Sequence, residues 1–63
     1  MTPQQFKDLR KSLGLTQTGM AMALRSTRRT INRYESGAIP IEKTALRVCE
    51  YLKKYGVLEG DER

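Results

Sequence analysis

The stretch that decides the fold runs from Leu13-Gly14-Leu15-Thr16-Gln17 to Ile31-Asn32-Arg33-Tyr34-Glu35-Ser36-Gly37. It predicts two short helices joined by a tight turn, and each helix follows a threonine whose hydroxyl can cap it. From Arg25 to Arg33 the chain holds four arginines and no acid. On the second helix, Ile31 and Tyr34 fall on one side and the arginines on the other. Such a helix suits a negatively charged groove, which indicates the major groove of DNA.

Two further helices flank this pair. Thr2-Pro3 predicts the start of the first helix, since a hydroxyl cap precedes a proline whose missing N–H costs nothing there. We expect this helix to end at Gly14 and a last helix to run from about Ile41 to Tyr55. No segment alternates as a strand does, so the predicted class is all-α. The apolar stripe of the last helix comprises Ile41, Ala45, Val48, Cys49, Leu52 and Tyr55.

The length of 63 residues predicts a single domain near the lower limit for a self-sufficient core. The net charge of +5 is unevenly placed, because residues 1–58 hold eleven bases against four acids. We therefore expect a DNA-binding domain over residues 1–58 and a short, charged, flexible tail over residues 59–63. A basic balance alone is weak evidence, since ribosomal and membrane-surface proteins share it.

The composition argues against an enzyme. Cys49 is the single cysteine and the chain has no histidine. An intramolecular disulfide is excluded, and we expect no metal site, no cofactor and no small-molecule ligand. Catalysis would also lack a histidine and clustered carboxylates. No run is long or apolar enough for a membrane span or a secretory signal, which predicts a cytoplasmic protein.

Over residues 6–52 the pattern resembles the lambda-repressor/Cro (XRE) helix-turn-helix family. The resemblance implies a compact lambda-repressor-like domain of four helices, or five, with the recognition helix at about residues 28–36. Each shared residue type has a physical reason: Ala21 is small where the next helix crosses, and Gly37 supplies the positive φ with which the chain leaves the recognition helix. The residues that carry the resemblance are Leu9-Arg10, Leu13-Gly14-Leu15-Thr16-Gln17, Met20-Ala21, Leu24, Ile31, Tyr34-Glu35-Ser36-Gly37 and Pro40.

Two positions depart from the family pattern. Arg25 stands where the family usually has a glycine in left-handed conformation, which would strain a non-glycine residue by about 1–2 kcal/mol. Ser26 stands where an apolar residue usually packs under the third helix. Both departures bear on the stability and the angle of the turn.

The exposed side of the recognition helix supplies the predicted base-reading residues. Arginine donates two hydrogen bonds to guanine O6 and N7, and asparagine pairs in the same way with adenine N6 and N7. The alternative is a charged helix face that is merely solvated. The predicted readers are Arg28, Arg29, Asn32 and Arg33.

The resemblance also implies contacts to DNA phosphates and a scaffold pair. Gln17 matches the family glutamine that bridges to a phosphate, and Arg10 with Glu35 matches a pair that ties the first helix to the recognition helix. A solvated role is the alternative for Gln17 and for Lys43. The predicted phosphate contacts are Gln17, Thr27, Ser36, Lys43 and Arg10.

The last helix and the residues after it carry more apolar surface than one small domain covers. This excess predicts a homodimer contact, although the chain could instead fold back over its own domain. The predicted contact comprises Tyr51, Tyr55, Val57 and Leu58.

These observations predict a sequence-specific transcriptional regulator that binds double-stranded DNA as a dimer. We expect a small Cro-type autorepressor of a phage or mobile-element operon, acting on a palindromic operator. The alternatives are an antitoxin-type protein-interaction module that also regulates its own operon, and a two-helix interaction module.

Overall fold

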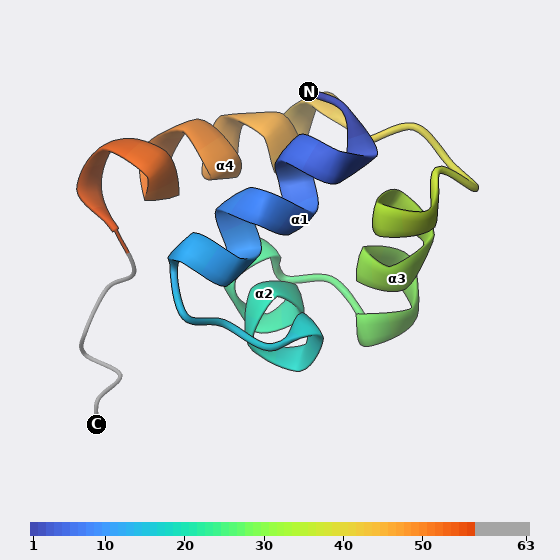
Figure 1. Cartoon of the computed structure of the whole chain (residues 1–63), viewed down its shortest axis with the longest axis horizontal. Coiled ribbons are helices and arrows are strands. Elements are labelled where there is room, and N and C mark those ends of the chain that lie inside the picture. The colour runs from blue at the N-terminus through green and yellow to red at the C-terminus, as the bar shows by residue number, and fades with distance from the viewer. Residues whose placement is uncertain (57–63) are drawn as a thin grey trace.

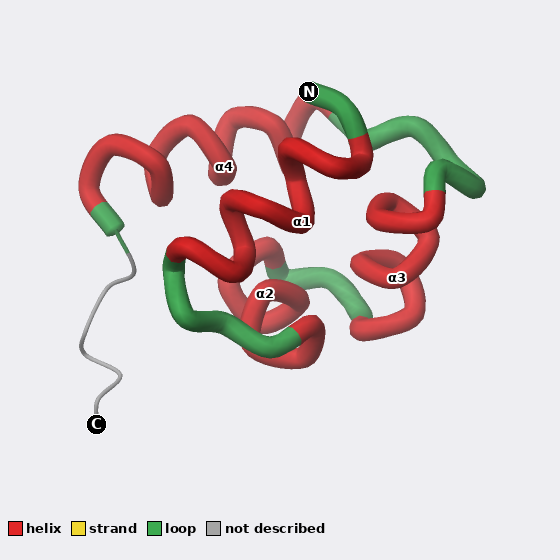
Figure 2. The backbone as a smooth tube through the Cα atoms, viewed as in Figure 1, coloured by secondary structure: helices red, strands yellow, loops and turns green. Residues whose placement is uncertain are grey.

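The computed structural model describes residues 1–56, which form four α-helices joined by short loops (Figures 1 and 2). The helices are α1 (Pro3–Ser12), α2 (Gln17–Leu24), α3 (Arg28–Ser36) and α4 (Lys43–Tyr55). Since no strand occurs within residues 1–56, the predicted all-α class is confirmed. The predicted tail lies outside the described residues.

Threonine side chains fix the starts of three helices, as the sequence predicts. Thr2 forms a capping box with Gln5, in which Gln5 N donates to Thr2 Oγ1 (3.1 Å) and Thr2 N donates to Gln5 Oε1 (2.9 Å). Thr16 and Thr27 accept a backbone N–H in the same way at the starts of α2 and α3. The boundaries of the helix-turn-helix unit therefore follow from local hydrogen bonding.

The last helix begins two residues later than predicted. Glu42 is its N-cap with an extended backbone (φ −67°, ψ 155°), and Leu46 N donates to Glu42 O. Ile41 packs against the core from the loop, so this apolar residue does not belong to the helical stripe in which the sequence places it. At the other end of the helix, the predicted apolar stripe was wrong to include Tyr55, because its side chain is 64% exposed.

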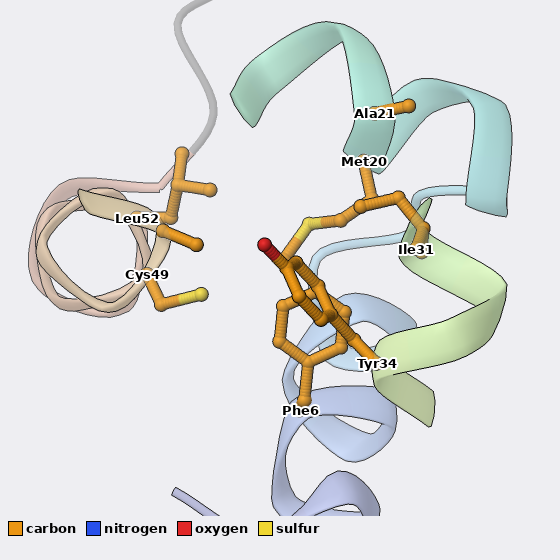
Figure 3. Close-up of a cluster of buried hydrophobic side chains, with 8 residues drawn as sticks. Phe6, Met20, Ala21, Ile31, Tyr34, Cys49 and Leu52 are labelled. Carbon is orange, nitrogen blue, oxygen red and sulfur yellow. The ribbon is translucent and has the colours of Figure 1, made fainter. Parts of the chain in front are cut away.

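The core lies where all four helices meet, and Figure 3 shows its side chains converging. Phe6 of α1 and Tyr34 of α3 pack edge to face, with ring centroids 5.5 Å apart. Met20 fills the space beside them and is fully buried. The remaining core residues are Ala21, Ile31, Ala45, Cys49 and Leu52.

Cys49 belongs to this core and behaves as a small apolar residue. Its side chain is fully buried. Burial, and to a lesser extent the neighbouring Glu50 carboxylate, raises the pKa of the Cys49 thiol. The thiol is thus protonated at neutral pH and is a poor nucleophile.

The turn between α2 and α3 contains the left-handed arginine that the resemblance implies. Arg25 has φ 55° and ψ 46°. Arg25 N donates to Met22 O (3.2 Å) and Ser26 N donates to Ala21 O (2.8 Å), which closes the end of α2. The backbone bonds hold this conformation against the preference of the side chain, so the residue at position 25 is strained.

Replacing Arg25 with glycine is expected to leave stability unchanged or to raise it by up to about 1 kcal/mol, since glycine adopts this φ freely. For a domain of this size that gain raises the thermal midpoint by about 4–8 °C. The matched control is Arg47→Gly at an exposed position inside α4, which should cost about 1 kcal/mol. A midpoint lowered by Arg25→Gly would mean that the arginine side chain makes a stabilising contact.

Candidate nucleic-acid interface

Helix α3 presents two unlike faces. Ile31 and Tyr34 are buried in the core, which turns the opposite side of the helix to solvent. The four predicted base-reading residues are all exposed. Because α3 projects at one end of the molecule, this face is open to a large partner (Figure 1).

Three of the predicted readers surround one depression at the starts of α2 and α3. It has a volume of about 250 Å³ and is lined by Gln17, Arg28, Arg29 and Asn32. The structure thus brings a predicted phosphate contact, Gln17, next to predicted base readers. Arg33 follows Asn32 on α3 and does not line the depression.

The positive charge here opposes the stability of the helix. Arg28 and Arg29 occupy the first turn of α3, which holds no acid. Cations at this end face the positive pole of the helix dipole, at a cost of about 0.3–1 kcal/mol each. Among residues 1–56, the arginines of this face have no acidic partner, since the one ion pair there joins Arg10 to Glu35. The face is therefore a concentrated site of uncompensated positive potential, suited to an anion.

The pair formed by Arg10 and Glu35 lies behind this face and holds three segments together. Arg10 Nε and Nη2 donate to the Glu35 carboxylate at 2.6 and 3.3 Å. Arg10 Nη1 donates to Leu15 O at 2.9 Å, which fixes the loop between α1 and α2. The side chains are only 12% and 5% exposed. A phosphate contact by Arg10, still a prediction, would have to use its remaining N–H groups.

Gln17 is tied to α3 by contacts that the sequence does not predict. Gln17 Nε2 donates to Glu35 Oε1 at 3.2 Å and lies 3.5 Å from Asn32 Oδ1. These partners are 18 and 15 positions away in the sequence. No local pattern signals such a contact, because it depends on how α2 crosses α3.

The other predicted contacts lie at helix ends. Thr27 caps α3 and its hydroxyl lies 3.0 Å from the Thr30 hydroxyl, while Ser36 Oγ donates to Arg33 O (3.2 Å) at the other end. Lys43 is exposed in the first turn of α4. Their contacts with phosphate stay predictions.

The predicted dimer contact is only partly described. Tyr51 and Tyr55 are 44% and 64% exposed, and their rings lie 4.9 Å apart on the last turns of α4. Val57 and Leu58 lie outside the described residues.

Within residues 1–56, no helix has the length and apolarity to cross a bilayer, and no three metal-ligating side chains gather. The described site offers hydrogen-bond donors and the permanent positive charges of its arginines.

The comparison with protein families identifies one match. The family described as Helix-turn-helix matches residues 6–57, which is most of the chain and includes all of α2, α3 and α4. No curated protein and no solved structure matches the chain significantly.

Proposed function

The chain belongs to the lambda-repressor-like (XRE) helix-turn-helix family of DNA-binding transcription regulators, and on that premise we propose that it is a small dimeric Cro-type repressor. It would bind a palindromic operator, inserting one α3 helix per copy into the major groove. The observation that carries this proposal is the exposed face of α3, where arginines without acidic partners among residues 1–56 surround a depression.

Direct reading of base edges is supported by the residue types on that face. Arg28 and Arg29 lie at the start of α3, the part of a recognition helix that reaches base edges. Arginine matches the two acceptors of guanine with two donors in a fixed plane. Thr27 and Ser36 at the ends of α3, and Lys43 on α4, are placed to hold phosphates on either side.

Substitutions should separate reading from positioning. Arg29→Ala and Arg33→Ala are each expected to weaken binding to selected operator DNA by about 1–3 kcal/mol, with a smaller effect on random DNA. Lys43→Ala should weaken both kinds of binding about equally, because a phosphate contact carries no sequence information.

Arg29→Lys is the matched control, since it keeps the charge and removes the planar pair of donors. It should lose specificity while keeping affinity for random DNA. Gel-shift titrations on both DNAs measure this, and equal losses for every variant on both DNAs would contradict base reading.

A dimer through the end of α4 is supported by the exposed tyrosine pair Tyr51 and Tyr55. Figure 1 places this end of α4 on the side of the molecule away from α3. Two copies joined there would hold their α3 helices apart, as successive major grooves about 34 Å apart require. Val57 and Leu58, which follow directly in the sequence, would extend the apolar contact.

Tyr55→Glu is therefore expected to give a folded monomer with much weaker operator binding, because two like charges would face each other across the two-fold axis. Tyr55→Phe keeps the ring and should stay dimeric. Sedimentation at micromolar concentration measures the mass, and circular dichroism checks the helix content. A wild-type protein that is monomeric and still binds a full palindrome tightly would contradict this contact.

Repression would follow from occupancy, since a dimer seated on a promoter excludes the polymerase. Within this proposal the protein works in the bacterial cytoplasm and regulates its own operon on a phage or other mobile element, as the resemblance implies.

A further inference from the structure

Helix α2 has an apolar outer side as well as an apolar inner side. It holds no charged residue, whereas α1, α3 and α4 each hold several. Met20 and Ala21 are buried in the core. Met22 comes two positions after Met20 and so points to the other side of the helix, where it is 75% exposed. No other large apolar side chain among residues 1–56 is as exposed, so these residues leave an apolar surface of α2 open.

The residues beside Met22 are small. Gly19 lies one turn before it and Ala23 directly after it, and the helical period places Gly19 between the two. Leu15 borders Gly19 on the far side, since its Cδ2 is 3.3 Å from the point that a Gly19 Cβ would occupy. We call Leu15, Gly19, Met22 and Ala23 the α2 face. It carries one projecting side chain next to a position that has none, so two copies related by a two-fold axis can each seat Met22 over Gly19 of the other.

The distribution of charge favours a second copy of the chain as the occupant of the α2 face. The chain has a net charge of +5, and its other helices carry exposed cations that repel the same helices of another copy. The cation nearest to the α2 face in the sequence is Arg25, at the C-terminal end of α2. When two α2 helices cross antiparallel, each Arg25 lies at the opposite end of the contact from the other. Eight residues of helix span about 12 Å, which exceeds the Debye length of about 8 Å at physiological salt.

The size of the α2 face sets the strength of this contact. One exposed methionine and its half-buried neighbours fall far short of the roughly 800 Å² per partner that stable complexes bury. Two free copies would therefore rarely pair here. Copies held side by side on DNA have a far higher effective concentration, at which a weak contact forms.

We propose that the α2 face joins copies bound at neighbouring operators, so that one bound dimer recruits the next. The contact rests on the proposed DNA-binding function and adds a second surface to it. It shares no residue with the arginine face of α3 or with the Tyr51–Tyr55 contact, which joins the two copies on a single palindrome.

Footprint titrations of the full chain on DNA with one or two selected operators test this contact. The distance between the two operators is varied one base pair at a time. At the distance that brings two α2 faces together, the second operator should be filled about 5- to 50-fold more tightly than a single one, as burial of two methionines allows. A further half turn of DNA, about 5 base pairs, moves the second dimer to the other side of the duplex and should abolish the gain.

Met22→Glu places two carboxylates against each other and should make the two operators fill independently at every distance. Met22→Leu keeps the apolar side chain and should keep the gain. Arg47→Gln on the exposed side of α4 is the matched control, since it changes the net charge by the same amount as Met22→Glu and leaves the α2 face intact. Position 22 is exposed, so thermal midpoints should change little and verify that each variant is folded.

The contact is overturned if wild type fills two operators independently at every distance, if Met22→Glu keeps the gain, or if Arg47→Gln loses it equally. The titration on a single operator reports separately on the proposed function. A wild type that binds no single operator overturns that function and this contact together, whereas tight single-operator binding without any gain overturns the contact alone.

Discussion

Raising the salt concentration from 50 to 200 mM is expected to weaken binding to operator DNA by about 10³- to 10⁵-fold. The reason is that the proposed dimer, if it neutralises about 6–10 phosphates, displaces that many condensed counterions, and added salt opposes their release. The cations of α3 have no acidic partner among residues 1–56, so their charge is available for this exchange. Gel-shift titrations over a salt series give the slope directly.

Lys43→Ala is the control for this prediction. Removal of one phosphate contact per copy should reduce the salt slope by about one unit per copy while leaving the preferred sequence unchanged. Affinity that does not depend on salt would contradict a role for the arginine face in phosphate binding.

Glu35→Ala is expected to destabilise the domain by about 3–5 kcal/mol, because it leaves the largely buried Arg10 guanidinium without its counter-charge. Gln17 loses its acceptor in the same substitution. A domain of this length has a total stability of only about 3–9 kcal/mol, so much of the protein should be unfolded at 37 °C. Urea titration followed by circular dichroism measures the loss.

Two controls distinguish loss of the Arg10–Glu35 ion pair from a general effect of removing a carboxylate on stability. Glu50→Ala removes an exposed carboxylate of α4 and should change stability by less than about 0.5 kcal/mol. The double variant Arg10→Met/Glu35→Leu removes both charges and should recover most of the stability. A Glu35→Ala protein as stable as wild type would contradict the structural role of the pair.

Much of the fold could be predicted because it is encoded locally. Thr2, Thr16 and Thr27 cap helices by contacts within three residues, and the left-handed φ of Arg25 follows from the family turn. The predicted start of α4, at about Ile41, was two residues too early because Ile41 is apolar and packs on the core without being helical. Periodicity detects burial, and it cannot distinguish a buried loop residue from the first residue of a helix.

The predicted base-reading residues lie on the exposed side of α3, as the sequence predicts, whereas their hydrogen-bond connections were not predicted and their role in reading DNA stays a prediction. The 3.6-residue period of a helix is enough to place Arg29 and Asn32 on the side opposite Ile31 and Tyr34, with Arg28 exposed in the first turn. The link from Gln17 to Asn32 and Glu35 requires the crossing of α2 over α3, which only the folded chain supplies. The exposure of these residues was therefore predictable, and the contacts that depend on how α2 crosses α3 were not.

The single carboxylate of Glu35, shared by the guanidinium of α1 and the amide of α2, has a consequence for protein engineering. A library that randomises every polar position near the groove would lose most members to misfolding, since any change at position 35 removes the joint between three helices. Randomising only positions 28, 29 and 33 leaves that joint intact. New operator preferences should therefore be easiest to obtain by varying the exposed arginines while Arg10, Gln17 and Glu35 are kept unchanged.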